Sequence, residues 1–465
     1  MEPTESRSRA SSSPLLSLLG GLALLAVGGY LASGVKAAQG TVQAPPTTLI
    51  FSGGVQRFAI PDCIARAGDE AGREACRTVS QVLRSDLRFE IDQNQFVPEA
   101  SMSFIAALDP DAPKFKDWES IGAGYLVITK ASVTQGRLQV ELRVHFVSSG
   151  QAMLQKAYSA SVENPRIIAH QAADDILALT QIKGVARSKI AFVSDRDSTK
   201  DRRVKELYLM DYDGFNQRRW TVNNSLNILP TWGPDGRSLA YVSYRQGTPM
   251  LFQALLCEAR SVANISGEKG SQAFAPSWSP DGKKIAFASD RSGNMDVWVV
   301  NADGSSARNL TSNAASETAP CWSPTGQEIA FTSNRTGAPQ LFVMDADGLN
   351  VRRLTQYGSY NDACAWSPAK DRGEIAFTSR IDSGFEVAVL DIASGEVRQI
   401  TEGRGSCEYP TWAPNGRHLA FSCNRSGTWQ ITVSDRDGRN VQSLAAGPGN
   451  NVQPDWGVAA ACPVG

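Results

Sequence analysis

The chain has 465 residues, 42% of them hydrophobic, so it is long enough for two or three domains that each bury a core. Its 46 lysines and arginines against 47 aspartates and glutamates leave a formal net charge of -1. Because no excess of positive charge is available to follow a phosphate backbone, we expect no nucleic-acid partner. The three histidines, His145, His170 and His418, are far apart in the sequence, which argues against a multi-histidine metal centre.

The N-terminus has the pattern of an export signal. Arg7 and Arg9 precede an apolar run from Leu15 to Val35, and small residues follow near Ala37. We therefore predict a signal peptide over residues 1–37, and export of the body to the periplasm. The apolar run is about as long as the ~20 residues that cross a bilayer, so an uncleaved, membrane-anchored sensor is the alternative.

The cysteine pattern fits an oxidising compartment. The chain has eight cysteines, and Cys63 and Cys76 are a candidate local pair. For several of the others a buried free thiol is an equally good interpretation. Because no C-x-x-C motif is present, redox catalysis has little support.

An N-terminal α/β domain is predicted over residues 49–183. Apolar residues at Ala75, Val79, Leu83 and Leu87 indicate a helix, which can begin after Pro61. The other predicted elements are three strands in a meander, followed by a second helix: 125–129, 138–147, 152–160 and 166–179. Nothing in this domain pairs a nucleophile with a base.

The second half of the chain repeats a Trp-x-Pro-x-Gly phrase. The repeated tryptophans are Trp232, Trp278, Trp322, Trp366, Trp412 and Trp456. Their mean spacing of about 45 residues is typical of a four-stranded propeller blade, and each is followed by a short β-rich run such as Ile285–Ala288. We interpret the tryptophans as packing residues rather than as a ligand cage.

The phase of the repeat predicts a closed ring. The chain enters it at Lys189–Val193 without a preceding tryptophan strand, and it leaves at Trp456 without a following strand. The two halves complete one blade, so we predict an all-β six-bladed β-propeller over residues 184–458, with a C-terminal tail over 459–465.

Three Asp-x-Asp-Gly phrases resemble the first half of a calcium loop: Asp211/Asp213, Asp345/Asp347 and Asp435/Asp437. The distal glutamate of such a loop does not follow, so we interpret them as hairpin turns. We predict no cofactor, with a structural calcium ion in the central channel as the alternative. His170 and His418 are expected to be structural or solvated, and the charged run 195–205 to be a solvated hairpin tip.

Enzyme functions have little support in the sequence. No G-x-S-x-G nucleophile elbow occurs, and the nine residues after Trp456 leave no room for a hydrolase domain. We therefore expect no catalytic residue. The alternative is an exported propeller enzyme or a carbohydrate-binding protein that uses a cation in its channel.

The segments that differ between blades come just before the tryptophan strands. They are 272–276, 316–320, 360–363 and 407–410, and by phase we expect them to form loops at one mouth of the ring. Variable loops on a rigid frame are the usual place for a propeller to bind another molecule, and a merely connecting role is the alternative.

The order of these features resembles the TolB family, the periplasmic components of Tol-Pal envelope systems. The likeness covers about Leu49 to Trp456. It rests on Trp118 followed by Gly122-Ala123-Gly124-Tyr125-Leu126-Val127, on the helix phrase Ala169-His170-Gln171-Ala172-Ala173-Asp174, and on the six blade phrases.

The resemblance implies a non-enzymatic adaptor that is peripheral to the membrane through its partners. Its propeller mouth would bind the peptidoglycan-associated lipoprotein Pal, and the flexible N-terminal arm, residues 38–48, would bind TolA or fold back onto its domain. Other outer-membrane proteins are further candidate partners, and the implied role is outer-membrane integrity and envelope constriction at cell division.

The resemblance also suggests site residues. The positions facing Pal would be Gln272, Ala275 and Thr318, where Gln272 stands at a position that is often histidine in the family. Neighbours in the same mouth segments complete the candidate site: Glu317, Tyr360, Asp362, Glu408 and Tyr409. The candidate residues of the arm are Gln39, Val42, Pro45 and Pro46.

Overall fold

The structure is a computed structural model that describes residues 56–105, 108–256, 262–266, 270–356, 358–381, 384–444 and 447–460. Ala44–Gly465 form one compact unit. The predicted signal peptide and N-terminal arm lie outside the described residues, and the predicted domain boundaries stay predictions. Among the residues described, we find no helix with the length and apolar character needed to span a membrane.

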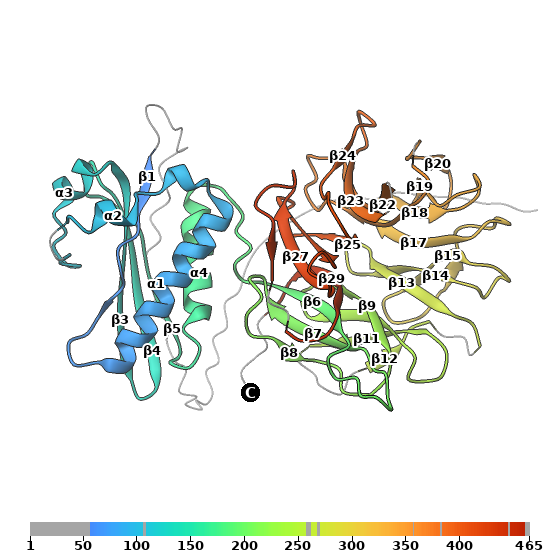
Figure 1. Ribbon diagram of the computed structural model, residues 1–465, viewed down its shortest axis with the longest axis horizontal. Coiled ribbons are helices and arrows are strands. Elements are labelled where there is room, and N and C mark those ends of the chain that lie inside the picture. Colours follow the sequence, from blue (N-terminus) through green and yellow to red (C-terminus); the bar gives the residue numbers. More distant parts are fainter. Residues whose placement is uncertain are drawn as a thin grey trace, which may run out of the picture. The chain divides into compact units, whose positions relative to one another are not determined.

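The N-terminal domain is a mixed sheet with helices on both faces (Figure 1). Its strand order is β1-β3-β4-β5, and β2 pairs with β3. The strands are β1 (Arg57–Ala59), β2 (Ile64–Ala65), β3 (Ala123–Thr134), β4 (Arg137–Phe146) and β5 (Ala152–Ser161). The helices are α1 (Glu70–Glu90), the 3-10 helix η1 (Gln93–Gln95), α2 (Glu99–Met102), α3 (Phe115–Ser120) and α4 (Arg166–Leu179).

Alternation along β3 gives this sheet two apolar faces. Tyr125 and Val127 pack in the core formed with α1 and α4, whereas Leu126 and Ile128 pack on the opposite face with Trp118 of α3. Successive residues of a strand point to opposite faces, so a run of apolar residues on a central strand serves both cores. The three predicted strands of the meander are confirmed, and α4 has the predicted bounds.

The first helix begins later than predicted. Asp69, not Pro61, precedes its first turn, and the Asp69 carboxylate accepts a hydrogen bond of 2.8 Å from the Gly72 backbone N–H. The segment between them instead contains β2, and the candidate pair Cys63 and Cys76 forms a disulfide. The N-cap preference of aspartate therefore decided the helix start.

The second half forms six four-stranded sheets among the described residues, as predicted. The blades, numbered in chain order, have the strand orders β29-β6-β7-β8, β9 to β12, β13 to β16, β17 to β20, β21 to β24 and β25 to β28.

The strands of the first three blades are β29 (Asn451–Val458), β6 (Ser188–Ser194), β7 (Glu206–Asp211), β8 (Arg218–Arg219); β9 (Asn227–Trp232), β10 (Ser238–Ser243), β11 (Met250–Leu255), β12 (Val262–Asn264); β13 (Ala273–Trp278), β14 (Lys284–Ser289), β15 (Asp296–Asn301) and β16 (Arg308–Asn309).

The strands of the last three blades are β17 (Glu317–Trp322), β18 (Glu328–Ser333), β19 (Gln340–Asp345), β20 (Arg352–Arg353); β21 (Asn361–Trp366), β22 (Glu374–Ile381), β23 (Gly384–Asp391), β24 (Val397–Gln399); β25 (Cys407–Trp412), β26 (His418–Cys423), β27 (Gln430–Asp435) and β28 (Gln442–Ser443).

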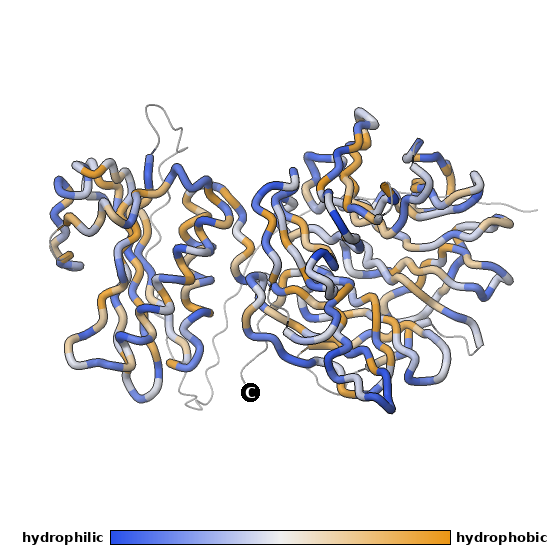
Figure 2. The backbone as a smooth tube through the Cα atoms, in the orientation of Figure 1, coloured by the Kyte–Doolittle hydropathy of each residue, from blue (hydrophilic) through white to orange (hydrophobic). Residues whose placement is uncertain are grey.

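Blade 1 closes the ring with strands from both ends of the repeat. The last strand, β29, pairs antiparallel with β6, and Trp456 lies opposite Ile190. This pairing confirms the prediction that the two incomplete repeats make one blade. The pairing supplies the fourth strand of blade 1, so that the ring contains no incomplete blade among the described residues. Figure 2 shows hydrophobic residues along the strands and hydrophilic residues at the turns.

Three of the repeated tryptophans bond to the blade that precedes their own. The indole Nε1–H of Trp278 donates to the Thr231 carbonyl oxygen at 3.3 Å, and that of Trp412 donates to Ala365 at 3.0 Å. At the closure Trp232 donates in the same way to the carbonyl of Asp455, at 3.1 Å. The prediction that these residues pack between blades is confirmed.

Two more disulfides lie among the described residues of the propeller. Cys321 of β17 is bonded to Cys364 of β21. The bond joins the inner strands of blades 4 and 5, where the inner strand of a blade is the one that contains the repeated tryptophan. Cys407 and Cys423 are bonded within blade 6, where they are cross-strand partners. From the sequence alone, a disulfide and a buried free thiol were equally good interpretations of these cysteines.

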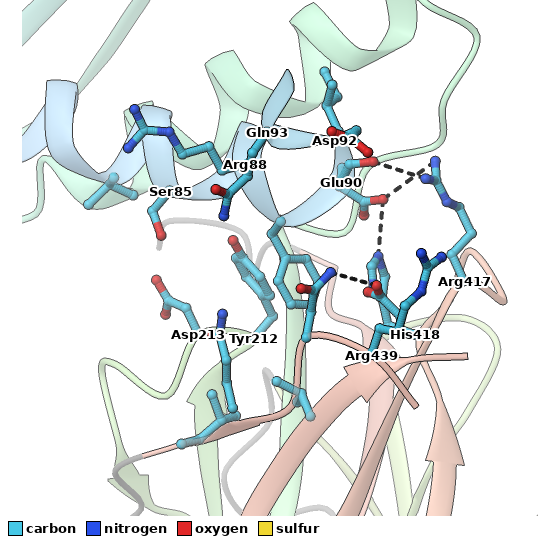
Figure 3. A pocket seen from close by; sticks show the side chains of 18 of the residues that line it. Ser85, Arg88, Glu90, Asp92, Gln93, Tyr212, Asp213, Arg417, His418 and Arg439 are labelled. Carbon is cyan, nitrogen blue, oxygen red and sulfur yellow. Dashed lines mark hydrogen bonds and ion pairs between the residues drawn. The ribbon is translucent and has the colours of Figure 1, made fainter. Parts of the chain in front are cut away.

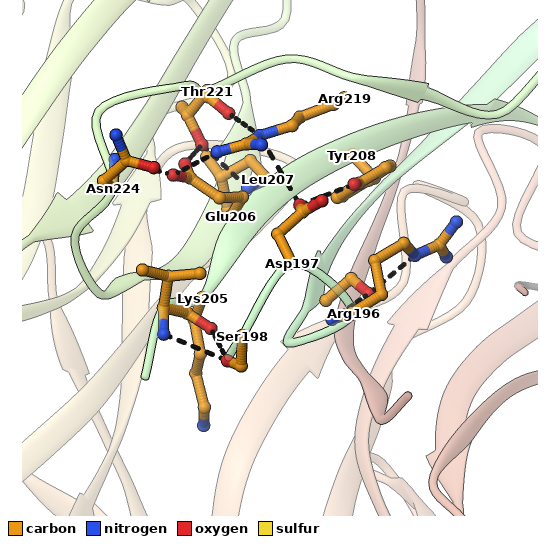
Figure 4. A network of polar contacts seen from close by, with 12 residues as sticks. Arg196, Asp197, Ser198, Lys205, Glu206, Leu207, Tyr208, Arg219, Thr221 and Asn224 are labelled. Carbon is orange, nitrogen blue, oxygen red and sulfur yellow. Dashed lines mark hydrogen bonds and ion pairs between the residues drawn. The ribbon is translucent and has the colours of Figure 1, made fainter. Parts of the chain in front are cut away.

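The charged run 195–205 is only partly the solvated tip that was predicted. Residues 198–203 are exposed, but Asp197 accepts a hydrogen bond of 2.7 Å from the Tyr208 hydroxyl (Figure 4). The Arg196 guanidinium lies 4.3 Å from the centre of the Tyr208 ring. The base of this hairpin is therefore a bonded part of blade 1, held by charge and by cation–π contact.

Candidate functional site

The ring has two ends with different turns. The inner strands begin at one end of the ring. In blade 3, for example, Ala273 at the start of β13 lies opposite Ser289 of β14. We call this the mouth end. At the other end Trp278 lies opposite Ile285, next to the Trp-x-Pro-x-Gly turn, and the Asp-x-Asp-Gly turns lie there too. We call this the joint end.

The predicted mouth segments are not loops but the first halves of inner strands. β13, β17, β21 and β25 include them, so that only Gln272, Ser316 and Tyr360 lie outside a strand. Three of these segments contain a proline, which cannot donate a hydrogen bond to a strand ladder. The inner strand of a blade is an edge strand of its sheet, however, and an edge strand can accommodate a proline.

Each inner strand contains a bulge at its third residue. These residues have positive φ, between 45° and 57°, although none is glycine: Leu229, Ala275, Ala319, Ala363, Tyr409 and Gln453. The ladder loses register beside them, as between Phe274 and Ser277. Bulges are frequent next to binding sites because they redirect the strand. The same backbone feature therefore recurs six times at the mouth end with side chains that differ between blades.

Four predicted mouth residues come together on blades 5 and 6. The Tyr360 hydroxyl donates to the Asp362 carboxylate at 2.8 Å. Burial, and then the charge of Asp362, raises the pKa of Glu408. Burial also raises the pKa of Tyr409, which feels the charges of Asp362 and Glu408. We call these four residues the acidic–aromatic group.

The acidic–aromatic group contains a carboxylate whose hydrogen-bonding capacity is only partly used. The Asp362 Oδ1 atom is buried and has no hydrogen-bond partner among the described residues. A buried acceptor without a partner costs free energy, about 1–3 kcal/mol, which a donor from a partner would recover. Tyrosine rings beside carboxylates also suit the centre of a protein interface.

The other predicted mouth residues differ in how accessible they are to a partner. Gln272 is exposed, and its backbone N–H donates to Asp290 at 2.7 Å; Ala275 and Thr318 are half-buried. Glu317 is fully buried and accepts hydrogen bonds from the Ser333 hydroxyl and Arg335, at 2.8 and 3.1 Å. Glu317 therefore supports the blade 4 hairpin rather than facing a partner. Gln39, Val42, Pro45 and Pro46 lie outside the described residues.

The joint end contacts the N-terminal domain through two clusters of charged residues, and Figure 3 shows the cluster around Glu90. The first is around Glu90, the last residue of α1. Its carboxylate accepts a hydrogen bond from Asn415 at 2.8 Å and lies 3.2 Å from His418 Nε2. Arg417 donates to the Glu90 backbone carbonyl at 2.9 Å, and His418 Nδ1 lies 3.1 Å from Asp435 Oδ1.

The second cluster is around Asp86, one turn earlier on α1. Its carboxylate lies 2.8 Å from His170 Nδ1 and accepts a hydrogen bond of 2.7 Å from the Tyr212 hydroxyl. Arg166 forms an ion pair with Asp213 of the blade 1 turn. The expectation that His170 and His418 are structural is thus confirmed, and both are buried, at 4% and 3% exposure.

One group of side chains has the geometry of metal ligands. Within the described ranges, ligand atoms of Asp86, His170 and Asp213 lie within 4.8 Å of one another. The carboxylates of this group already bond to His170, Tyr212 and Arg166, so we interpret it as an ion-pair cluster. The calcium ion considered for the channel stays a prediction.

A cleft of about 1190 Å³ adjoins the two clusters. Its lining comes from α1 and from the turns of blades 1 and 6, and includes Arg88, Glu90, Tyr212, Asp213, His418 and Arg439 (Figure 3). No sequence motif pointed to Asp86, Glu90 or Asn415. A usable signal was present, because blade 6 has Asn415 and His418 where blade 3 has Asp281 and Lys284.

Comparisons with known proteins agree with this architecture. A family model described as the TolB beta propeller domain matches residues 177–460, and one described as the TolB amino-terminal domain matches residues 51–153. A Tol-Pal system protein TolB of Roseobacter denitrificans is 36% identical over 266 residues, 56% of this chain and 58% of the relative. One of Desulfosudis oleivorans is 32% identical over 260 residues, 55% of this chain and 57% of the relative.

These alignments span a little more than half the length of each relative. A solved structure extends the likeness to both domains. The crystal structure of TolB from Acinetobacter baumannii matches with a TM-score of 0.72 at 25% identity, and the match covers 87% of this chain and 97% of that chain.

Proposed function

Because the chain belongs to the TolB family, we propose that it is the non-enzymatic periplasmic adaptor of a Tol-Pal system. It is exported by the signal peptide over residues 1–37, binds Pal at the mouth end of the propeller, and binds TolA through the arm over residues 38–48. In this role it links the outer membrane to the inner-membrane complex, and so supports outer-membrane integrity and constriction at division.

The observation that carries this proposal is that only one end of the ring contacts the described part of the N-terminal domain. The hydrogen bonds between the described parts of the two domains fall at the joint end, on residues such as Asn415 and Tyr212. The mouth end keeps the acidic–aromatic group, with the unpartnered Asp362 Oδ1. A protein partner can therefore dock at the mouth without displacing the N-terminal domain.

The chemistry of the mouth suggests what the partner presents. Glu408 and Asp362 are close enough for the charge of one to raise the pKa of the other, so an added donor or positive charge would relieve their repulsion. We expect backbone N–H groups or a basic side chain of Pal in this place. Binding should weaken at high salt if a charged side chain is used.

The arm gives the adaptor its second site. If the arm has a docked and a free state, binding of Pal at the mouth can shift their populations and thereby change the affinity for TolA. By thermodynamic linkage TolA must then change the affinity for Pal by the same factor. Arm residues Gln39, Val42, Pro45 and Pro46 are the candidates for this contact.

The mouth is tested by calorimetric titration of Pal into the wild type and two variants. Tyr409→Ala should weaken binding about tenfold or more, as expected for an aromatic residue at the centre of an interface. The control, Leu349→Ala, changes an apolar residue that is 62% exposed in a joint-end turn and should leave the affinity unchanged. Equal affinities for wild type and Tyr409→Ala would refute the mouth assignment.

The arm is tested by deletion of residues 38–48. The variant should lose binding to TolA and retain the unfolding temperature and the affinity for Pal of the wild type. Retained binding to TolA would refute the arm's role.

The alternative, a propeller that uses a channel cation to bind carbohydrate or to act as an enzyme, predicts a different result. Calcium would then raise the unfolding temperature relative to a chelator.

A further inference from the structure

The two charged clusters of the joint end share an arrangement across the domain boundary. His170, from the N-terminal domain, faces Asp211 and Asp213 of the propeller. His418, from the propeller, faces Glu90 of the N-terminal domain. Each histidine also has a carboxylate of its own domain at hydrogen-bond distance, Asp86 for His170 and Asp435 for His418.

The Asp86 cluster is electrically balanced only when His170 carries a proton. Three carboxylates meet there, those of Asp86, Asp211 and Asp213. Two permanent positive charges face them, since Lys189 of β6 pairs with Asp211 and Arg166 of α4 pairs with Asp213. The remaining titratable neighbour is the Tyr212 hydroxyl, which donates to Asp86. A neutral His170 would leave one negative charge uncompensated.

His170 is placed to supply that charge. Its Nδ1 lies 2.8 Å from Asp86 Oδ2, and its Nε2 lies 3.9 Å from Asp211 and 4.0 Å from Asp213. The Nε2 atom is buried and makes no hydrogen bond with a described residue. An imidazolium uses both nitrogens as donors and would attract both carboxylates, whereas a neutral ring could serve only one side.

The Glu90 cluster has the same balance. The carboxylates of Glu90 and Asp435 face His418, and Arg417 lies 3.7 Å from Glu90. The neutral neighbours Asn415 and Asn440 donate to Glu90 and Asp435. On the cleft side Arg439 forms an ion pair with Asp437 and also feels the charges of Asp435 and Asp92. The ring of Phe89 covers His418, with centroids 4.2 Å apart.

The titration behaviour of both histidines agrees with the charge balance. Burial lowers the pKa of His170, but the hydrogen bond to Asp86 and the charges of Asp86, Asp213 and Asp211 raise it by more, so that it lies above its usual value. Burial likewise lowers the pKa of His418, and the bonds and charges of Asp435 and Glu90 more than compensate. Burial raises the pKa of Asp213, which favours the closed contact at lower pH as well.

We propose that the contact between the N-terminal domain and the propeller is controlled by pH: it is closed while His170 and His418 carry protons and it opens as they lose them. This inference goes beyond the adaptor role, because it concerns the joint and not the binding of Pal or TolA. It assigns a regulatory function to residues that lie at the end of the ring opposite the mouth.

The direction follows from linkage. A histidine with a raised pKa in the closed state stabilises that state fully below its pKa in the open state, and the stabilisation is lost as pH rises through the raised value. Loss of the proton leaves each cluster with an uncompensated buried negative charge, which is costly until water reaches it. Between the two pKa values the equilibrium constant for opening should rise about tenfold per pH unit for each histidine.

Hydrogen exchange of the full chain tests the proposal directly. Protection factors, corrected for the intrinsic pH dependence of exchange, would be compared at about pH 5.5 and about pH 8.5, which bracket the usual histidine range. We expect protection of the segments 83–91 and 415–420 to fall at least tenfold at the higher pH, while strand β4 keeps its protection. Unchanged protection at the joint, or an equal fall in β4, would overturn the proposal.

Variants identify the groups responsible. In His170→Gln/His418→Gln the joint should show the same protection at both pH values, whereas the control His145→Gln should keep the pH dependence of the wild type. His145 belongs to β4 and bonds to the Gly150 carbonyl, away from the joint. A pH dependence that persists in the double variant would overturn the proposal.

Proton NMR of the wild type covers the case in which the double variant does not fold. The chain has three histidines, so its imidazole signals can be followed one by one. Two of them should titrate above the usual histidine range and in step with the loss of protection. Titration of all three within the usual range would contradict the proposal.

Discussion

The two ends of the propeller ring are built from the same repeat, yet they treat charge in opposite ways. At the joint end the charged residues Asp86, Glu90 and His418 are buried, and each has a partner across the domain boundary. At the mouth end Asp362 and Glu408 repel each other, and Asp362 keeps one oxygen without a partner. The joint end is an interface already satisfied within the chain, whereas the mouth end is suited to an interface with another protein.

The difference teaches where a repeat protein places its binding residues. Positions that pack, such as the tryptophans and the Ile-Ala-Phe strands, keep the same chemistry in each blade because they fill the same space. Positions that contact the N-terminal domain or face a partner have residues that differ from those of the other blades. Asn415 and His418 do so at the joint end, and Tyr409 does so at the mouth end, where three other blades have alanine.

The largest expected effect is at the joint. Asp86→Ala removes the acceptor of two buried donors, His170 Nδ1 and the Tyr212 hydroxyl. The free energy of unfolding, measured with urea at about pH 6, should fall by about 3–5 kcal/mol, the usual cost of breaking a buried ion pair. The matched control on the same helix, Glu74→Ala, affects an exposed ion pair and should cost less than about 0.5 kcal/mol. Similar losses in both variants would mean that the joint is not a bonded interface.

The next effect concerns the inner strands that line the channel. Replacement of Cys321 and Cys364 by alanine removes the disulfide that joins blades 4 and 5. The two cysteines are 43 residues apart in the sequence. Unfolding should become about 2–4 kcal/mol easier, as expected for a disulfide that closes a loop of this length. Replacement of Cys407 and Cys423, which are 16 residues apart, should cost about 1 kcal/mol less. The reverse order would show that strain, not loop closure, dominates.

The closure of the ring should show its own pH dependence. Burial raises the pKa of Asp455 to about 6, while hydrogen bonds from Trp232 and Thr411 lower it. Because the folded state then holds the proton more tightly than the unfolded state, stability falls as pH rises from about 4 to about 6, by up to about 1.4 kcal/mol per pH unit. Asp455→Asn should lack this component, measured as the difference between the two curves of unfolding free energy against pH. Parallel curves would show that Asp455 does not titrate in this range.

The smallest effect concerns the bulges of the mouth end. Ala363 has φ of 53°, a conformation that costs a residue with a side chain about 1 kcal/mol. Ala363→Gly should therefore raise the free energy of unfolding by up to about 1 kcal/mol. Ala365→Gly, two residues later on the same strand and without positive φ, should lower it by a similar amount. A loss in both variants would mean that the bulge is not strained.

The sequence predicted the parts of the fold that repeat or alternate. The tryptophan spacing and the phase of its first and last copies were enough for six blades and their closure through β29 and β6. The start of α1 was misplaced because proline was weighed above the capping carboxylate of Asp69. The loops predicted at the mouth are strands instead, because an edge strand can accommodate Pro276, Pro320 and Pro410.

The site could be predicted only where a single segment carries it. Tyr360, Asp362, Glu408 and Tyr409 were named from their place before the tryptophans, and the structure brings them together. The joint could not be found in this way, because Asp86 and Tyr212 are 126 residues apart. Asp86 belongs to no motif, and Tyr212 lies in an Asp-x-Asp-Gly phrase that predicts only a hairpin turn. Contacts of this kind depend on how two domains pack, and a local pattern contains no record of that.

The central claim is that the mouth end binds the partner while the joint end holds the chain's own domain. It is tested most directly by titrating Pal, at one fixed pH of about 6, into the wild type, the mouth variant Glu408→Gln/Tyr409→Ala and the joint variant His170→Gln/His418→Gln. The account predicts that the mouth variant loses at least about tenfold in affinity and that the joint variant binds within about twofold of the wild type. Full affinity of the mouth variant together with a tenfold loss in the joint variant would contradict it.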